Sequence, residues 1–281
     1  MGIDITITAG PDSNTSHVSA TGSVQHVITD KERGTFGLSD SALKSAVASY
    51  FGKAPNDAYL RSPTPWGDLY KTYSWPQVQT ILNVESSEIL GITSEPVIVK
   101  TQEFVNNSSK TGIFDVAISD QVENTASNQW STGGELSIEE KISYSIDFIG
   151  EAKGEVSLKY SQSWGIGGSH SSSVTVGSTS GVTVELEPGE SVVAELSASR
   201  GVMKVRLRYN AYLTGYVAVN YDPTYKDHHF WALPVGDVMK SGGIPNSVKS
   251  TEDIEVGYYS NSKIVLRDKS SGVQKATYFL T

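Results

Sequence analysis

Few residues in this sequence have the types and spacing that catalysis requires. The run 177–181 has the glycine spacing of a nucleophile elbow, which presents a serine for acyl transfer, but Thr179 stands at its centre and no helical pattern follows. The run 165–169 lacks the lysine of a phosphate-binding loop. His228 and His229 are adjacent, so in a strand they would face opposite sides and could not readily bind one metal. The sequence therefore predicts no enzyme, no metal site and no cofactor.

Composition narrows the class further. The 281 residues include no cysteine, which excludes disulfides, cysteine-bound metals and a cysteine nucleophile. The net charge of −9 leaves no basic surplus to neutralise phosphates, so no nucleic-acid partner is expected. The chain is rich in hydroxyl groups, with 40 Ser and 22 Thr. No window approaches the ~20 apolar residues that a transmembrane helix needs.

The most informative side chains lie in residues 135–164, where apolar and polar positions alternate. The apolar face consists of Leu136, Ile138, Ile142, Tyr144, Ile146, Phe148, Val156, Leu158, Tyr160 and Trp164. The polar face consists of Glu139, Lys141, Ser143, Ser145, Asp147, Lys153, Glu155, Ser157 and Lys159. Glu140 and Gln162 interrupt the apolar face. The pattern predicts two amphipathic strands joined by a tight turn at 149–151.

Two structures fit this hairpin. In a soluble sheet its apolar face would pack on a core, and the alternation alone favours this simpler interpretation. In a membrane, strands of this length could cross the bilayer, which takes ~9–11 tilted residues, with the apolar face toward lipid. One hairpin would leave backbone groups unpaired in lipid, so several copies would have to close a barrel. The same segment can adopt both states in succession, and six acidic against three basic residues between 135 and 164 predict a net negative lumen.

The elements that must position these residues change character near residue 84. Before it, residues 3–8 alternate as a strand, a helix begins at Ser39 and ends at Gly52, and aromatic and proline residues crowd 59–82. After it, period-two runs cover 95–120, 135–164, 171–198, 201–221 and 254–280. We interpret 221–231 as a loop rich in proline, aromatic and histidine residues. The expected fold is mainly β and elongated. A small α+β N-terminal head at 1–84, with 221–245 folding back onto it, would precede a module of long antiparallel strands at 85–281.

The order of features between about residues 85 and 221 resembles that of a known toxin family. The run 128–151 reads NQWSTGGELSIEEKISYSIDFIGE, and it is similar to the tongue of the aerolysin-type β-pore-forming toxins, in the epsilon-toxin/mosquitocidal-toxin (ETX/MTX2) branch. Upstream, KTQEFVNNS at 100–108 resembles the family's strand that leads to a paired Asn. Downstream, the Ser-rich run 169–173, the turn EPGES at 187–191 and the strand 192–198 follow in the family's order.

This resemblance implies a function. Family members bind a cell-surface receptor through a variable head, assemble into rings of roughly seven or eight copies, and thread one hairpin per subunit into the target membrane. Phe148, Ile149 and Gly150 would lead the insertion. Many members are activated by proteolysis near a terminus, for which Arg267, Lys269 and Lys275 are candidate sites. Several insecticidal members are made without a signal peptide, and none is evident here, so we expect a soluble protein released by a non-standard route.

The receptor is expected to be a glycan or a glycoprotein. Aromatic faces stack on sugar rings, although aromatics this dense are more often part of a core. The candidate residues are Tyr59, Trp66, Tyr70, Tyr73 and Trp75. An insecticidal pore-forming toxin accounts for all of these features. The alternative is a carbohydrate-binding, lectin-like or storage protein without pore activity, which would leave the hairpin of 135–164 unexplained.

Overall fold

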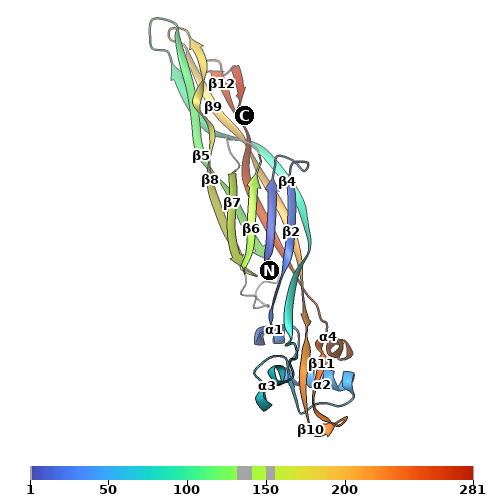
Figure 1. The fold of residues 1–281 in the computed structure, drawn as a ribbon. Coiled ribbons are helices and arrows are strands. Elements are labelled where there is room, and N and C mark those ends of the chain that lie inside the picture. The colour runs from blue at the N-terminus through green and yellow to red at the C-terminus, as the bar shows by residue number, and fades with distance from the viewer. Residues whose placement is uncertain (1, 132–140, 150–155, 281) are drawn as a thin grey trace.

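Long strands run along almost the whole length of this molecule. The computed structural model describes residues 2–131, 141–149 and 156–280. Its shape is elongated, with helices gathered at one end and a long twisted sheet above them (Figure 1). Of the described residues, 64% lie in strands and 12% in helices. The expected fold class, an elongated and mainly β molecule of long antiparallel strands, is confirmed.

Within the described residues, the large sheet contains ten strands, in the order β7-β6-β1-β2-β4-β9-β12-β5-β8, with β13 paired to β12. Their bounds are β1 Ile3–Ala9, β2 His17–Val27, β4 Gln79–Val105, β5 Gly112–Trp130, β6 Lys141–Phe148, β7 Val156–Ser163, β8 Gly168–Leu186, β9 Ser191–Thr214, β12 Val248–Asp268 and β13 Gln274–Phe279. Among the described strands, every pairing is antiparallel except that of β1 with β6. That one parallel ladder connects the hairpin β6–β7 to the rest of the sheet.

Alternation of side chains along the strands builds two cores. In β9 and β12 nearly every second residue is buried, because successive side chains of a strand point to opposite faces. The larger core extends from the helical end to the hairpin and includes Ile5, Tyr144, Tyr209 and Val256. The smaller core lies between β5, β9 and β12, and partly buried side chains of β4, β8 and β13 pack against it. Its buried members are Val116, Ile118, Ala194, Leu196, Ile264 and Leu266.

The helices lie at one end, around a three-stranded sheet. This end contains α1 Asp30–Thr35, α2 Asp40–Phe51, β3 Asp57–Tyr59, α3 Pro65–Thr72, β10 Tyr216–Tyr225, β11 His228–Pro234 and α4 Val235–Ser241. The expected helix is confirmed as α2: Ser39 caps its N-terminus, and Gly52 ends it with a left-handed backbone at φ 98°. β10 pairs with β3, and α4 packs on α2, so 216–241 lie beside the N-terminal helices. No helix among the described residues is long and apolar enough to cross a membrane.

One expected loop is a hairpin. Residues 221–231 were expected to lack strands, but β10 and β11 pair across them, through a turn in which Lys226 and Asp227 have positive φ. The proline at 223 falls at an irregularity in the ladder, where no hydrogen-bond donor is needed. The domain boundary near residue 84 remains a prediction. The sheet order places β1 and β2 in the long sheet, so we propose a head made of about residues 28–78 and 215–247.

Candidate functional site

The hairpin β6–β7 lies at one edge of the long sheet. Its strands pair antiparallel, with Tyr144 opposite Tyr160 and Ser143 opposite Ser161. β6 also pairs with β1, in parallel, and β7 ends the strand order. Several candidate site residues fall outside the described ranges, and these are Leu136, Ile138, Glu139, Gly150, Lys153 and Glu155.

The apolar face of the hairpin is packed against the larger core. Ile142, Tyr144, Ile146, Leu158 and Trp164 are each at most 8% exposed. Phe148, Val156 and Tyr160 are half-buried, and Ile149 is exposed. Full burial of such a side chain contributes about 1.5–3 kcal/mol, so the hairpin cannot leave the sheet without another favourable contact for this face.

The polar face of the hairpin points to solvent. Lys141, Ser143, Ser157 and Lys159 are exposed, and Ser145 and Asp147 are half-buried. The alternation read from the sequence therefore corresponds to one buried and one wet face in this state. The docked arrangement is the soluble-sheet interpretation of the hairpin. Its role in a membrane remains a proposal.

A carboxylate lies beneath the docked hairpin. Glu252 of β12 is fully buried and accepts hydrogen bonds from Tyr144 Oη of β6 (2.7 Å) and Tyr209 Oη of β9 (2.6 Å). It also accepts one from Asn128 Nδ2 of β5. Asn128 Oδ1 in turn accepts from Tyr160 Oη of β7 at 2.8 Å. Both strands of the hairpin are therefore bonded to one network, directly or through one amide.

Aromatic rings surround this network. The Tyr144 and Tyr160 rings stack with centroids 4.6 Å apart and an 8° interplanar angle. The His170 ring of β8 stacks on Tyr160 at 3.9 Å. Burial raises the pKa of the Glu252 carboxyl above its ordinary value, and its three hydrogen bonds only partly oppose that rise. Burial, together with the neighbouring Glu252, also raises the pKa of Tyr209.

Sequence reasoning missed Glu252, although a signal was present. Ser250, Glu252, Ile254, Val256 and Tyr258 share one buried face of β12. The alternating run that the sequence predicts begins at residue 254, two positions after Glu252. An acidic residue in register with a buried apolar face is the feature that could have identified it.

Two features weaken the docking of the hairpin. Gln162 Oε1 and Trp164 Nε1 are buried with no hydrogen-bond partner among the described residues. An unsatisfied buried polar atom costs about 1–3 kcal/mol. The ladder that joins β6 to β1 is parallel, which is slightly less stable per residue than an antiparallel one. The docked hairpin is thus well packed, but two of its buried polar atoms lack hydrogen bonds.

A second candidate surface lies at the helical end. The Trp66 ring contacts Tyr59 and Phe230 with centroids 6.3 and 5.2 Å apart, and Tyr73 stacks on Trp75 at 4.7 Å. We call these five side chains the aromatic surface. Trp66 and Tyr73 are 46% and 47% exposed. Four receptor candidates thus lie together, and Phe230, in the misread segment 221–231, joins them.

The backbone is strained at Trp66, an exposed residue of the aromatic surface. Trp66, Gly67 and Asp68 all have positive φ, and the values at Trp66 and Asp68 are 61° and 66°. A bulky residue in this region is a genuine outlier, which costs about 1–3 kcal/mol. Asp68 holds the turn, since it accepts a hydrogen bond from Ser62 Oγ at 3.0 Å. Strain of this kind is concentrated at functional sites.

Tyr70 departs from the expectation that it belongs to the receptor surface. It is only 3% exposed and packs with Leu69 and Ala218. Its hydroxyl donates to the backbone oxygens of Tyr59 (2.7 Å) and Tyr216 (3.0 Å). Because it joins α3 to β3 and β10, Tyr70 is a structural residue and is removed from the receptor candidates.

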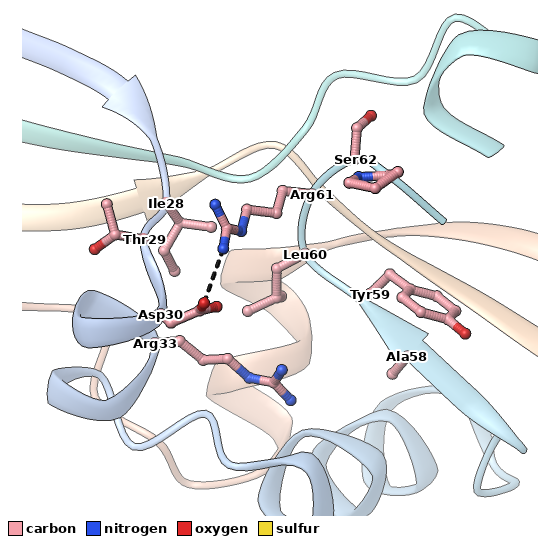
Figure 2. Close-up of a pocket in the computed structure, with 10 residues that line it drawn as sticks. Ile28, Thr29, Asp30, Arg33, Ala58, Tyr59, Leu60, Arg61 and Ser62 are labelled. Atoms are coloured by element: carbon pink, nitrogen blue, oxygen red, sulfur yellow. Dashed lines mark ion pairs between the residues drawn. The ribbon is translucent and has the colours of Figure 1, made fainter. Parts of the chain in front are cut away.

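A small polar pocket lies beside the aromatic surface (Figure 2). Its volume is about 280 Å³. Arg61 Nη2 and Asp30 Oδ2 form an ion pair in it at 3.0 Å. Tyr59 belongs to both the pocket and the aromatic surface. The lining includes Asp30, Arg33, Arg61 and Ser62, so the pocket offers charged and hydroxyl groups to a polar ligand.

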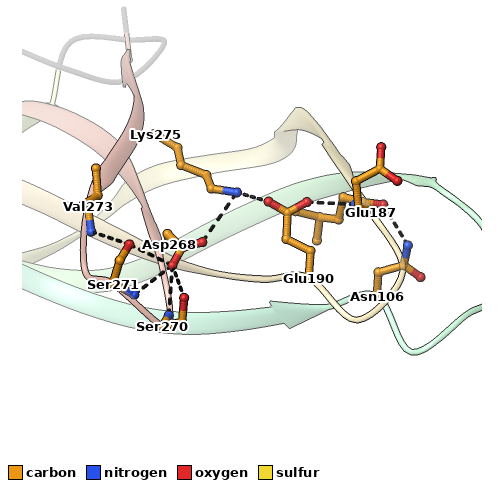
Figure 3. Close-up of polar contacts among 9 residues, drawn as sticks. Asn106, Glu187, Glu190, Asp268, Ser270, Ser271, Val273 and Lys275 are labelled. Carbon is orange, nitrogen blue, oxygen red and sulfur yellow. Dashed lines mark hydrogen bonds and ion pairs between the residues drawn. The ribbon is translucent and has the colours of Figure 1, made fainter.

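The candidate cleavage sites lie around β13. Arg267 is paired with Glu195 at 2.8 Å, and Lys269 with Glu103 at 2.6 Å. Lys275 of β13 pairs with Glu190 of the turn between β8 and β9, and with Asp268 at 3.7 Å (Figure 3).

Of the three, only Lys269 lies in a turn. That turn, between β12 and β13, is ordered by Asp268, whose carboxylate accepts hydrogen bonds from Ser270 and Ser271. These bonds lower the pKa of Asp268 to about 2. Arg267 and Lys275 lie in strands, whereas Lys269 lies in an exposed turn, the kind of segment that proteases cut most readily.

Comparison with known proteins gives two kinds of relative. The chain is 39% identical to U-megalopygitoxin(8)-Mc8 of Megalopyge crispata over 252 residues, which cover 90% of this chain and 87% of the relative. It is 38% identical to U-megalopygitoxin(8)-Mo12 of Megalopyge opercularis, with the same coverage. No protein-family model matches.

The solved structures share the fold at low sequence identity. Parasporin-2 of Bacillus thuringiensis, a toxin that recognises cancer cells, superposes with a TM-score of 0.64 at 17% identity, over 92% of this chain and 100% of that one. Mpp75Aa1.1 of Brevibacillus laterosporus, a β-pore-forming protein, gives a TM-score of 0.50 at 12% identity, over 89% and 94% of the two chains.

Proposed function

We propose a function from the family of this chain, which belongs to the U-megalopygitoxin(8) family of aerolysin-like toxins. In this proposal, the protein kills cells by forming a transmembrane β-barrel. The aerolysin-type resemblance of the sequence is confirmed, and its ETX/MTX2 branch remains a prediction. We propose that the protein acts without catalysis or a cofactor, and that its targets are insect cells.

The observation that carries this proposal is the hairpin β6–β7, which has one apolar face and one polar face. In the docked state the apolar face is buried against protein and the polar face is in contact with water. In a barrel the apolar face would contact lipid and the polar face would line the lumen, with no change in strand pairing within the hairpin. Closure by neighbouring copies, in a ring of roughly seven or eight, would satisfy the backbone groups at its edges.

We assign receptor recognition to the aromatic surface, with a glycan or glycoprotein as the ligand. Exposed Trp and Tyr rings stack on sugar rings, and the pocket beside them offers charged groups to a polar substituent. Trp66→Ala should weaken cell binding about 10–100-fold, as loss of a central aromatic contact does. Binding of the labelled chain to target cells at 4 °C measures this effect.

Tyr50→Ala is the matched control. Tyr50 is an exposed aromatic of α2, at 38%, and has no ring contact among those described for the aromatic surface. Its removal should leave binding within about twofold of the natural chain, as for a residue outside the contact. Equal losses from both variants, or none from Trp66→Ala, would refute the assignment.

We propose that cleavage at Lys269 frees β13 for assembly. β13 covers the smaller core with Ala276 and Tyr278, and only non-covalent contacts would hold it after a cut in the 269–272 turn. Its departure would expose the apolar residues of that core and the ladder edge of β12. Both are surfaces that a second copy of the chain could cover.

Conductance tests the function directly. Intact chain and chain nicked by trypsin would each be added to planar bilayers fused with plasma-membrane vesicles from an insect cell line. We expect discrete conductance steps, more frequent after nicking, with reversal potentials in a salt gradient that indicate cation preference, since acidic residues outnumber basic ones in 135–164. Binding without conductance in either form would favour the lectin-like alternative, and anion preference would contradict the lumen assignment.

A further inference from the structure

We propose that Glu252 positions the docked hairpin and makes its release depend on proton concentration, so that acid keeps the hairpin docked and a rise in pH favours release. This inference rests on the proposed role of β6–β7 as the inserting element. It concerns a residue outside the hairpin, on the face of β12 that the hairpin covers.

The geometry makes Glu252 a junction between the hairpin and the sheet. Two of its partners, Tyr209 and Asn128, belong to strands that stay in place, while Tyr144 belongs to the hairpin. Tyr160, also in the hairpin, caps Asn128 from the other side. Release of the hairpin would remove both tyrosines and open the carboxyl group to water.

The groups that face Glu252 are mostly neutral. Its three donors are two phenols and one amide, from β6, β9 and β5. His170 of β8 is one ring further away, behind Tyr160. On β12 itself, the neighbouring Asp253 adds negative charge and is paired with Arg206 of β9 at 2.7 Å. A negative charge on Glu252 is thus hydrogen-bonded, but no cation contacts it among these groups.

The sign of the pH effect follows from burial. Burial raises the pKa of Glu252 in the docked state, and exposure to water on release would bring it back toward the ordinary value. The docked state therefore binds the proton more tightly. The stabilisation of the docked state by this proton is fully present below the ordinary pKa of a glutamic acid. It is lost as pH rises through the raised pKa of Glu252 in the docked state. One proton changes the docking equilibrium by at most about tenfold per pH unit in that window.

Glu252→Gln tests the inference, because it keeps the shape and hydrogen-bonding ends but cannot ionise. In the absence of membranes, we expect the thermal unfolding midpoint of the natural chain to fall below that of Glu252→Gln as pH rises from about 4 to about 8. The midpoints of the two chains should converge at the acid end of this range. Asp253→Asn, in the next position of the same strand but on its exposed side, should retain the natural profile. His170→Gln tests whether the histidine ring behind Tyr160 contributes to the profile.

Release is measured by permeabilisation of the same insect-cell vesicles. The natural chain should release dye faster as pH rises, and Glu252→Gln should be slower near pH 8 and independent of pH, after correction for receptor binding measured in parallel. If neither chain releases dye but the unfolding midpoints diverge as expected, the proposed pore function fails while the role of Glu252 stands. If dye is released and the profiles of natural chain and Glu252→Gln are parallel, the inference about Glu252 is overturned.

A second variant covers a failure of Glu252→Gln to fold. Tyr144→Phe keeps the ring stack on Tyr160 and removes one hydrogen bond that favours the charged carboxylate. The pH at which release and unfolding accelerate should therefore move upward. An unchanged midpoint in this variant would overturn the inference.

Discussion

A chain in which a disulfide tethers β6 to β1, made by Thr6→Cys with Ser145→Cys, should lose permeabilising activity down to the leak of protein-free vesicles. Thr6 and Ser145 are register partners in the parallel ladder, and both lie on its solvent side. Paired strand positions are within the Cα separation that a disulfide requires, about 4.4–6.8 Å. The chain has no other cysteine, so one bond forms, and reductant should restore activity.

The matched control locks the hairpin to itself. Ser143→Cys with Ser161→Cys joins β6 to β7, also at register partners with exposed side chains. Since the hairpin is proposed to leave the sheet and enter the barrel with its two strands still paired, this bond should leave dye release close to that of the natural chain. Full activity of the oxidised Thr6–Ser145 variant would show that β6 need not leave β1. Loss of activity in both oxidised variants would show that the hairpin must open internally.

The faces of the hairpin could be predicted because side-chain direction in a strand has a period of two. Ile142, Ile146 and Leu158 are buried, and Ser143 and Lys159 exposed, as the alternation indicated. The helix 40–51 was predictable for a similar reason, since capping by Ser39 and Gly52 is a local property.

The partners of those faces could not be predicted. The ladder of β6 with β1 joins residues more than a hundred positions apart, and period-two alternation is the same whichever strand lies beside it. The same limit hid Glu252, whose partners come from three other strands. The segment 221–231 does not show its strands in the sequence because proline and histidine obscure the alternation, while the pairing of β10 with β11 supplies the strand context that overrides local propensity.

The second large effect expected is an alternation of chemical environment along the inserted hairpin. Ile146 faces Leu158 on the apolar side, and Ser145 faces Lys159 on the polar side. In the docked chain, cysteines at the two apolar positions should react with neither a lipid-soluble nor a water-soluble thiol reagent, because both sites are buried. In the barrel, the apolar positions should meet lipid and the polar positions should meet the wet lumen.

Thiol labelling of these four single-cysteine variants on permeabilised membranes is therefore the most direct test of the account. A cysteine at 146 or 158 should react with the lipid-soluble reagent and be protected from the water-soluble one, and a cysteine at 145 or 159 should do the reverse. Conductance and binding of each variant, measured alongside, establish that the labelled chain is the active one. If active chains give one reagent preference at all four positions, or if positions 146 and 158 stay unreactive to both reagents as in the docked chain, then β6–β7 does not form the wall of the pore.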